Sequence, residues 1–215
     1  MALTKFNFNS FDVTTAASSG LAFNSSANGF TTASAGSLNL IATNTITSGV
    51  SSSSFTSGID STYDTYIFKF INMHAANEYD AFQINFSVDG GSNYNVTKTT
   101  TFFRARHNEA DNTTGIPYET GQDIPQGTGY QNLTYNNGIS NDESTSGTIF
   151  LFSPSSTTFV KHFISFNSGL EGGGYYQNTY VAGYANTTSA INAVAFKMSS
   201  GNIDSGVIKM YGITK

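Results

Sequence analysis

Hydrophobic and polar residues alternate along most of the chain that follows residue 58. The clearest example is segment 82–88, where phenylalanine, isoleucine and valine occupy every second position and glutamine, asparagine and serine lie between them. A period of two is typical of a half-buried antiparallel strand. The segment Asp89-Gly90-Gly91-Ser92 follows directly and tolerates the positive φ angles of a tight turn. We therefore predict a hairpin between 82–88 and a strand that begins near Tyr94.

A second strand, over 63–73, is predicted to be apolar on both faces. Tyr66, Phe68 and Phe70 share one face, and Met73 belongs to the opposite face. A strand of this kind belongs in the centre of a sheet, because both of its faces need cover. Further strands are predicted over 95–104, 148–152, 158–166, 175–184, 191–198 and 206–213.

The spacing of these strands predicts the fold class. Short strands separated by clusters of Gly, Asn, Ser and Asp are typical of a sandwich or a barrel, and no segment has a sustained helical pattern. The long connections favour Greek-key crossings over a simple meander. We predict an all-β, antiparallel, jelly-roll-like β-sandwich with an extended N-terminal arm of low charge.

Composition changes near residue 58. Residues 1–58 contain two charged residues, Lys5 and Asp12, and no Tyr or Pro. Their sparse apolar residues could not offset the entropy of ordering this segment alone. We therefore predict an arm or anchor over 1–58, held against the sheet or a neighbouring subunit, and a sandwich domain over 59–215. The candidate anchor residues are Phe6, Phe8, Phe11, Phe23 and Phe30.

Charge and cysteine content exclude several classes of function. The chain has 9 basic and 14 acidic residues among 215, which gives a net charge of −5, and charged residues make up 11%. Typical domains contain about 25%, so hydroxyl and amide groups must keep this surface hydrated. The absence of cysteine excludes disulfides and Cys-based zinc sites. Net acidity with two arginines argues against nucleic acid as a partner.

Targeting signals are not evident. The first residues lack the apolar region of a signal peptide, and no run approaches the ~18 apolar residues of a membrane span. We expect synthesis in a host cytoplasm, no membrane partner, and later work outside a cell. A virion component satisfies these conditions.

The long segment 104–147 is the first candidate for a contact surface. It contains Arg104, Arg106, His107 and six of the 14 acidic residues. Connections of this length are usually functional or mobile. The alternative is a solvated insertion whose arginines pair locally with its acids. Calcium could bind such oxygen ligands, but no Asp-x-Asp-x-Asp spacing occurs, so no metal or other cofactor is predicted.

Tyrosines suggest carbohydrate binding. Tyr118, Tyr130 and Tyr135 of the long segment could present amphipathic rings to a sugar or to a protein. The same idea applies to a second group near a glycine run. That group is Tyr175, Tyr176, Tyr180 and Tyr184. The alternative for Tyr180 and Tyr184 is a structural one, as half-buried strand residues.

Catalysis has little support. The histidines are His74, His107 and His162, and the alternation around His162 indicates a residue at the edge of the core. No Gly-x-Ser-x-Gly, His-Glu-x-x-His or phosphate-binding motif occurs. Glu78 and Asp80 could act as paired carboxylates, but we expect them to face solvent. The protein is predicted to be non-enzymatic, without catalytic residues.

Several strand and turn segments resemble a family of virion structural proteins from tailed bacteriophages of marine bacteria and cyanobacteria. The resemblance spans about residues 37–213. It is carried by 57–66 (SGIDSTYDTY), 86–92 (FSVDGGS), 101–105 (TFFRA), 196–203 (FKMSSGNI) and 206–213 (GVIKMYGI). Members are described as tail-fibre-like or minor structural proteins. The resemblance implies other virion proteins, in the capsid or the tail, as partners, and it implies no catalytic residues.

Two locations in a virion follow as expectations. The first is a capsid decoration or knob-like protein, anchored by its arm and projecting the sandwich. The alternative is a tail-associated receptor-binding module that contacts host glycan or a surface protein; a glycoside-cleaving enzyme is a third. The chain has no coiled-coil pattern to extend a fibre, which favours decoration. A homo-oligomer such as a trimer suits either location.

Overall fold

The computed structural model describes residues 19–23, 26, 30–34 and 37–213. Contacts within the chain divide it into two compact units, Met1–Asn39 and Leu40–Lys215. In the first unit, β1 (Ser19–Phe23) and β2 (Phe30–Ser34) form an antiparallel pair. Of the five candidate anchor residues, Phe23 and Phe30 are register partners in this pair. Phe6, Phe8 and Phe11 lie outside the described residues.

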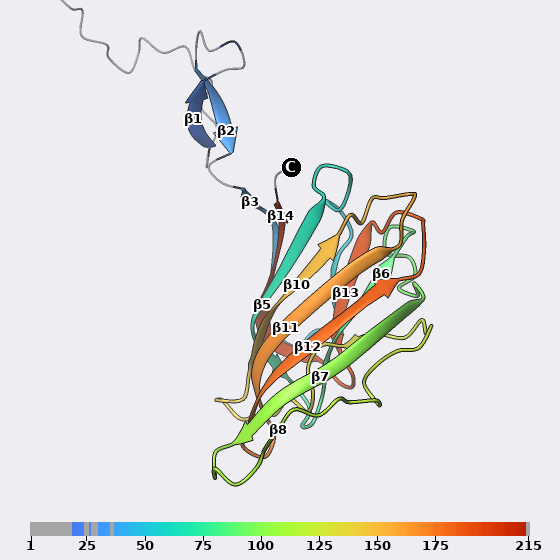
Figure 1. The fold of residues 1–215 in the computed structure, drawn as a ribbon. Coiled ribbons are helices and arrows are strands. Elements are labelled where there is room, and N and C mark those ends of the chain that lie inside the picture. Colours follow the sequence, from blue (N-terminus) through green and yellow to red (C-terminus); the bar gives the residue numbers. More distant parts are fainter. Residues whose placement is uncertain (1–18, 24–25, 27–29, 35–36, 214–215) are drawn as a thin grey trace, which may run out of the picture. The chain divides into compact units, whose positions relative to one another are not determined.

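The second unit consists of two antiparallel sheets (Figure 1). The large sheet has the order β3-β14-β5-β10-β11-β12-β7-β8, and the small sheet has the order β4-β13-β6-β9. The strands of the large sheet are β3 (Leu38–Ile46), β14 (Ile203–Ile213), β5 (Thr65–Ala75), β10 (Thr145–Phe152), β11 (Lys161–Glu171), β12 (Tyr175–Ala185), β7 (Lys98–Asn108) and β8 (Thr114–Gly115). Those of the small sheet are β4 (Ser53–Phe55), β13 (Ala193–Met198), β6 (Phe82–Ser87) and β9 (Gln131–Asn132). The predicted all-β antiparallel sandwich is confirmed.

Aromatic side chains fill the space between the sheets. Phe70 of β5 contacts Phe82 of β6 with ring centroids 4.9 Å apart, and Phe82 stacks on Phe196 of β13 at 5.5 Å. Phe163 of β11 packs on Phe86 of β6 at 5.2 Å. All of these rings are buried. Burying a side chain of this kind contributes roughly 1.5–3 kcal/mol, so the inward faces of both sheets supply the main stabilisation.

β5 is central in the large sheet, as predicted, between β14 and β10. One detail of the prediction was wrong, because Met73 is fully buried with Phe70 instead of lying on the opposite face. Asn72 has a φ of 50°, and the register with β10 shifts between Gly147 and Thr145. This bulge turns the end of the strand and brings Met73 inward.

The predicted hairpin between 82–88 and the following strand was also wrong. β6 lies in the small sheet beside β13 and β9, whereas β7 lies in the large sheet. β6 is buried on both faces, since Asn85 and Ser87 are 0% exposed. Asn85 Nδ2 donates to the carbonyl oxygens of Tyr94 and Thr128 at 2.6 and 3.0 Å. The Asp89-Gly90-Gly91 turn therefore connects the two sheets.

The boundary of the sandwich lies well before residue 58. The second unit begins at Leu40, and β4 pairs with β13 with Phe55 opposite Val194. Ile46 and Phe55 are buried in the core. Residues 40–58, which the composition assigned to the arm, thus complete both sheets. A few apolar residues suffice there, because the core is already formed by the other strands.

Candidate functional site

Apolar residues cover much of the outer face of the large sheet, which points away from the small sheet. On β7, β11 and β12 the inward residues Phe102, Phe163 and Val181 are at most 1% exposed. Five apolar outward residues of these strands are 40–48% exposed, and Phe150 of β10 is partly buried. We call this surface the aromatic face, and its main residues are Phe103, Phe150, Ile164, Phe166, Tyr176 and Tyr180. An apolar patch of this kind is typical of an interaction site.

Contacts between neighbouring strands hold these rings in place. Phe103 and Tyr180 are register partners, and their rings stack with centroids 5.0 Å apart and planes 7° from parallel. Phe150 contacts Phe166 at 5.7 Å. Cross-strand aromatic pairs contribute roughly 0.2–1 kcal/mol each. The aromatic face is therefore an ordered surface built on regular strands.

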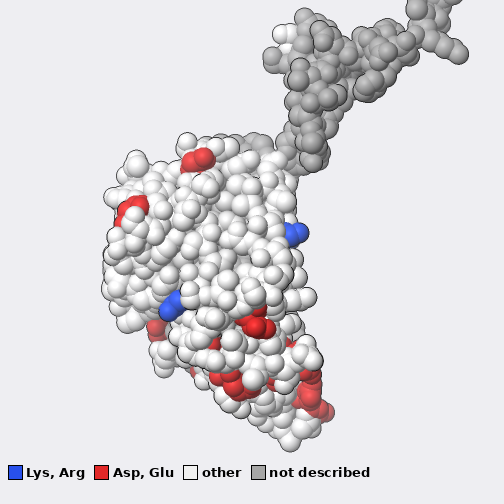
Figure 2. All heavy atoms as spheres, turned by 180° about the vertical axis from the view of Figure 1, so that it is seen from behind, with Lys and Arg blue, Asp and Glu red and all other residues white. Residues whose placement is uncertain are grey.

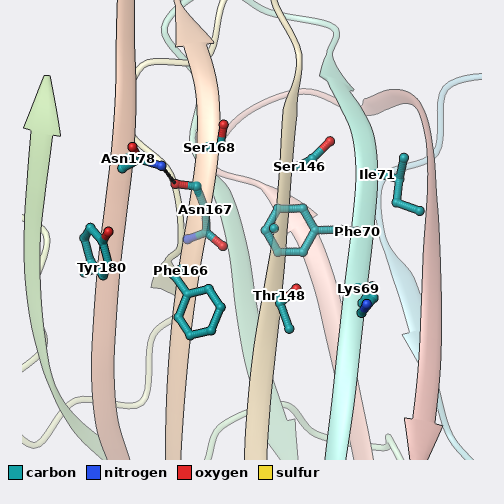
Figure 3. Close-up of a pocket in the computed structure, with 11 residues that line it drawn as sticks. Lys69, Phe70, Ile71, Ser146, Thr148, Phe166, Asn167, Ser168, Asn178 and Tyr180 are labelled. Carbon is teal, nitrogen blue, oxygen red and sulfur yellow. Dashed lines mark hydrogen bonds between the residues drawn. The ribbon is translucent and has the colours of Figure 1, made fainter. Parts of the chain in front are cut away.

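A shallow groove of about 600 Å³ crosses the aromatic face. In Figure 3 the ring of Phe166 is seen nearly face-on, and the ring of Tyr180 is seen nearly edge-on. Phe166 thus forms a floor and Tyr180 a wall. Ser168 and Asn178 add a hydroxyl and an amide to the lining. A second groove of about 490 Å³ lies on the same sheet, between Thr101, His162, Ile164 and Tyr184 and their neighbours.

Register places six outward residues of six adjacent strands in one transverse row. Each is the direct partner of the next, from β14 to β5, β10, β11, β12 and β7. The row is Lys209, Lys69, Thr148, Phe166, Tyr180 and Phe103. Neighbouring strands lie about 4.8 Å apart, so the row combines two cations, a hydroxyl and three rings in one line across the sheet.

One of the six predicted contact residues, Arg104, is interior, and another, Tyr135, is partly buried against the core. Arg104 is 4% exposed, and its guanidinium pairs with Glu119 at 2.8 Å and with Glu171 at 3.0 Å. The ring of Tyr135 lies 4.0 Å from the guanidinium carbon. Burial raises the pKa of the Glu171 carboxyl, and the positive charges of Arg104 and Arg106 offset part of this rise. The assignment of Arg104 to a contact surface was wrong, because Arg104 points inward from β7 at the same parity as Phe102, and the ring of Tyr135 packs on its guanidinium.

Arg106 and Tyr130 are partly buried, and each makes a cation–π contact within the molecule. The guanidinium of Arg106 lies over the ring of Tyr175 at 5.6 Å. The ammonium of Lys197 lies over the ring of Tyr130 at 4.9 Å, and burial raises the pKa of that tyrosine. The contact between Lys197 and Tyr130 joins the long segment to the small sheet. The contact between Arg106 and Tyr175 lies within the large sheet, between β7 and β12.

His107 and Tyr118 are the exposed members of the predicted set. Tyr118 is 50% exposed, and its hydroxyl donates to Asp123 at 2.8 Å. His107 contacts Asp111 at 2.9 Å and is the register partner of Tyr176. His107 therefore belongs to one end of the aromatic face, and Tyr118, which follows β8, is bridged to Phe103 at the edge of the same face.

The long segment 104–147 is a solvated insertion only in part: Arg104 pairs with Glu119, as the alternative predicted, and residues 107–130 are exposed or partly buried, but the following part is packed against the sheets. Gln131 and Leu133 are 0% exposed, and the Leu133 carbonyl accepts hydrogen bonds from Asn167 and Thr179 at 2.6 Å each. The segment thus covers the inner face of β11 and β12. Some of its polar side chains bond within the molecule, such as Gln131 with Thr100, and the outer face of the same strands is the open surface.

Sequence reasoning missed Phe103 and Phe166, and it favoured a structural role for Tyr180. The available signal was the pair of apolar residues at consecutive positions, such as Phe102 with Phe103 and Phe163 with Ile164. Such pairs predict a strand that is apolar on both faces. They do not tell whether both faces are covered, and here only the inner one is.

The histidines are not arranged as catalytic bases in the described part of the chain. His74 uses Nε2 toward the Ser140 carbonyl oxygen and Nδ1 toward Asp204. His162 is exposed on the aromatic face beside Tyr184, and so it is not at the edge of the core. Asp80 is buried and accepts from the backbone N–H of Ser200. It therefore serves a turn, contrary to the expectation that it faces solvent.

Charged groups are sparse and unevenly placed. Figure 2 shows the side of the sandwich opposite to Figure 1, where acidic side chains gather toward one end and few basic ones are visible. The strands β5 and β7 finish at this end, and β14 begins there. Exposed acidic residues that follow or precede these strand ends are Glu78, Glu109, Asp111, Asp142 and Asp204.

No family model matches the chain, and no curated protein or solved structure is significantly similar to it. Across residues 37–213 and the described part of the first unit, no three or more metal-ligating side chains are grouped to hold an ion. Over the same residues, no helix is long and apolar enough to cross a membrane.

Proposed function

We propose that this chain is a non-enzymatic structural protein of a phage virion, a capsid decoration protein that projects its sandwich and binds a partner through the aromatic face. The observation that carries the binding role is the row of ordered, half-exposed rings on an uncovered sheet face. Exposed rings of this kind stabilise a complex by burial. The virion setting rests on the resemblance and on the composition described above.

The division of the chain supports an anchored arrangement. The first unit is compact by itself, and residues 1–39 carry two charged residues. The second unit has its own core, so it stays folded without contributions from an anchor. A segment that attaches and a domain that projects are what a decoration protein needs.

A tail-associated receptor-binding module is the second candidate. The aromatic face favours it, because a receptor-binding protein must present a binding surface away from the particle. Both candidates use the same face, and they differ in where the chain sits on the virion.

Antibody labelling of intact virions, viewed by electron microscopy, tests the proposal. An antibody raised against the full chain is expected to label heads, and tail-less heads are the control. Label at the tail alone would favour the receptor-binding candidate. If mass spectrometry of purified virions found no peptide of this chain, the virion function would be wrong in either form.

A further inference from the structure

Two lysines of the transverse row lie directly opposite each other on adjacent strands. Lys69 of β5 and Lys209 of β14 are register partners. Like charges in this position destabilise a sheet. Neither lysine has an ion pair among the described residues. The outward residues that flank them on their own strands are uncharged, namely Ile67, Ile71, Val207 and Tyr211.

The aromatic face beside this pair contains no carboxylate. The outward positions of β10 and β11 carry hydroxyl, apolar and aromatic groups and His162. Those of β12 and β7 carry the same kinds of group, with Asn178 and His107 in addition. The transverse row thus carries two cationic groups and no carboxylate, while Asp204 pairs with His74 and Asp111 with His107 at one end of the sheet. This pattern is complementary to an anion.

We propose that the aromatic face binds an acidic polysaccharide that lies across the strands along the transverse row. Sugar rings pack on the floor and wall formed by Phe166 and Tyr180, and a carboxylate or sulfate group lies between Lys69 and Lys209. The inference deepens the proposed binding role and rests on it. It holds for a chain on the head or on the tail.

The geometry favours a sugar chain over a second copy of this protein. A twofold contact would place the same face on itself, and the transverse row offers no acid to meet the lysines. The groove is also open and lined by hydroxyl and amide groups next to rings, which suits a hydrated, amphipathic polymer. The strand spacing of about 4.8 Å is close to the length of one sugar unit in an extended chain.

Nucleic acid would also offer anions and flat rings, but the charge of the face argues against it. Single-stranded nucleic acid needs a positive groove that follows every phosphate. The row supplies two lysines at one end, and its remaining four residues are neutral. A polymer with spaced acidic groups and many hydroxyls fits this distribution better.

Calorimetric titration of the full chain tests the inference. The probes are polygalacturonate, which carries carboxylates, dextran sulfate, which carries sulfate esters, and neutral dextran. We expect binding to one acidic polymer at least, weakened by salt, and no binding to neutral dextran. The acidic polymer that binds more tightly identifies the anionic group.

Substitutions on exposed positions locate the site. The double variant Lys69→Met and Lys209→Met is expected to lose about tenfold in affinity, and Tyr180→Ala roughly tenfold. Lys197→Met, on the small sheet, is the matched control and should bind as the unmodified chain does. Thermal unfolding midpoints within about 2 °C of the unmodified chain would show that these variants are folded.

Four outcomes would overturn the inference. They are no binding to either acidic polymer, equal binding to neutral dextran, an equal loss in Lys197→Met, and tighter binding to oligo(dT) than to either polysaccharide. None of them depends on labelling of virions. The inference can therefore fail while the virion function stands, and the reverse also holds.

Discussion

Lysines in the interior fix two connections of the sandwich. Lys98 and Lys161 are 0% exposed although lysine is rarely buried. Lys98 Nζ donates to the Gly129 carbonyl oxygen at 2.6 Å, and Lys161 Nζ donates to those of Thr187 and Ser189 at 3.0 and 2.7 Å. Each ammonium thus ties an irregular segment to the start of a strand. The aliphatic part of the side chain meanwhile packs in the core.

Stability should depend on pH through Lys98. Burial lowers the pKa of its ammonium to about 8, from an ordinary value of 10.5. Between these values the unfolded chain binds more protons than the folded chain, so the free energy of unfolding rises with pH in this window. We expect the unmodified chain to gain on the order of 2 kcal/mol relative to Lys98→Met from about pH 8 to pH 10.5.

Urea unfolding of both chains at several pH values measures this difference. The comparison with Lys98→Met removes the contribution of tyrosines, which titrate in the same range. A constant difference between the two chains across the window would show that Lys98 has the same pKa in the folded and unfolded states.

At the scale of elements, short β4 has a larger role than its three residues suggest. Phe55 is 4% exposed, and its ring contacts Phe68 at 5.6 Å and Phe196 at 6.3 Å. The strand therefore joins β5 of the large sheet to β13 of the small one. It also extends the sandwich toward the N-terminus beyond the change in composition.

Phe55→Ala should destabilise the sandwich by about 3–5 kcal/mol, because it removes a buried ring and leaves a cavity. Chemical denaturation followed by circular dichroism measures the change. Phe159→Ala is a suitable control, since Phe159 is 72% exposed and should change the free energy of unfolding by less than about 0.5 kcal/mol. A loss below about 1 kcal/mol for Phe55→Ala would mean that β4 is not part of the cooperative unit.

At the scale of the whole molecule, the two units have separate tasks in the proposed function. Removing residues 1–36 leaves β3 and the complete second unit. We expect the shortened chain to unfold within a few degrees of the full chain, because its core is intact. We also expect it to be lost from virions, as measured by immunoblotting of purified particles. Normal incorporation would contradict an anchoring role for the first unit.

The alternation of apolar and polar residues was sufficient to predict where many of the strands lie, but not which strands pair with each other. Segments such as 175–184 and 206–213 form strands where alternation predicted them. The partner of β6 was missed, since alternation does not say which strands pair. Asn85 was predicted to face solvent but is buried. Its two hydrogen-bond partners, the carbonyl oxygens of Tyr94 and Thr128, lie 9 and 43 residues away in the sequence, so alternation could not reveal them.

The candidate site was harder to predict for a related reason. Arg104 resembled a surface cation, but its partner Glu171 is 67 residues away in the sequence. Phe166 resembled a core residue, because the sequence does not show that the outer face of β11 has no cover. Both errors concern which side chains are buried by distant parts of the chain, and this depends on how the long segment packs against the sheet.

The transverse row has a consequence for how this protein can evolve. Each of its positions comes from a different strand, and the residues on either side along that strand point into the core. A single codon change can therefore replace one position, such as Thr148, without moving the backbone or disturbing the interior. If the row binds as proposed, lineages of such a protein can change its ligand one residue at a time, while natural selection keeps the scaffold beneath constant.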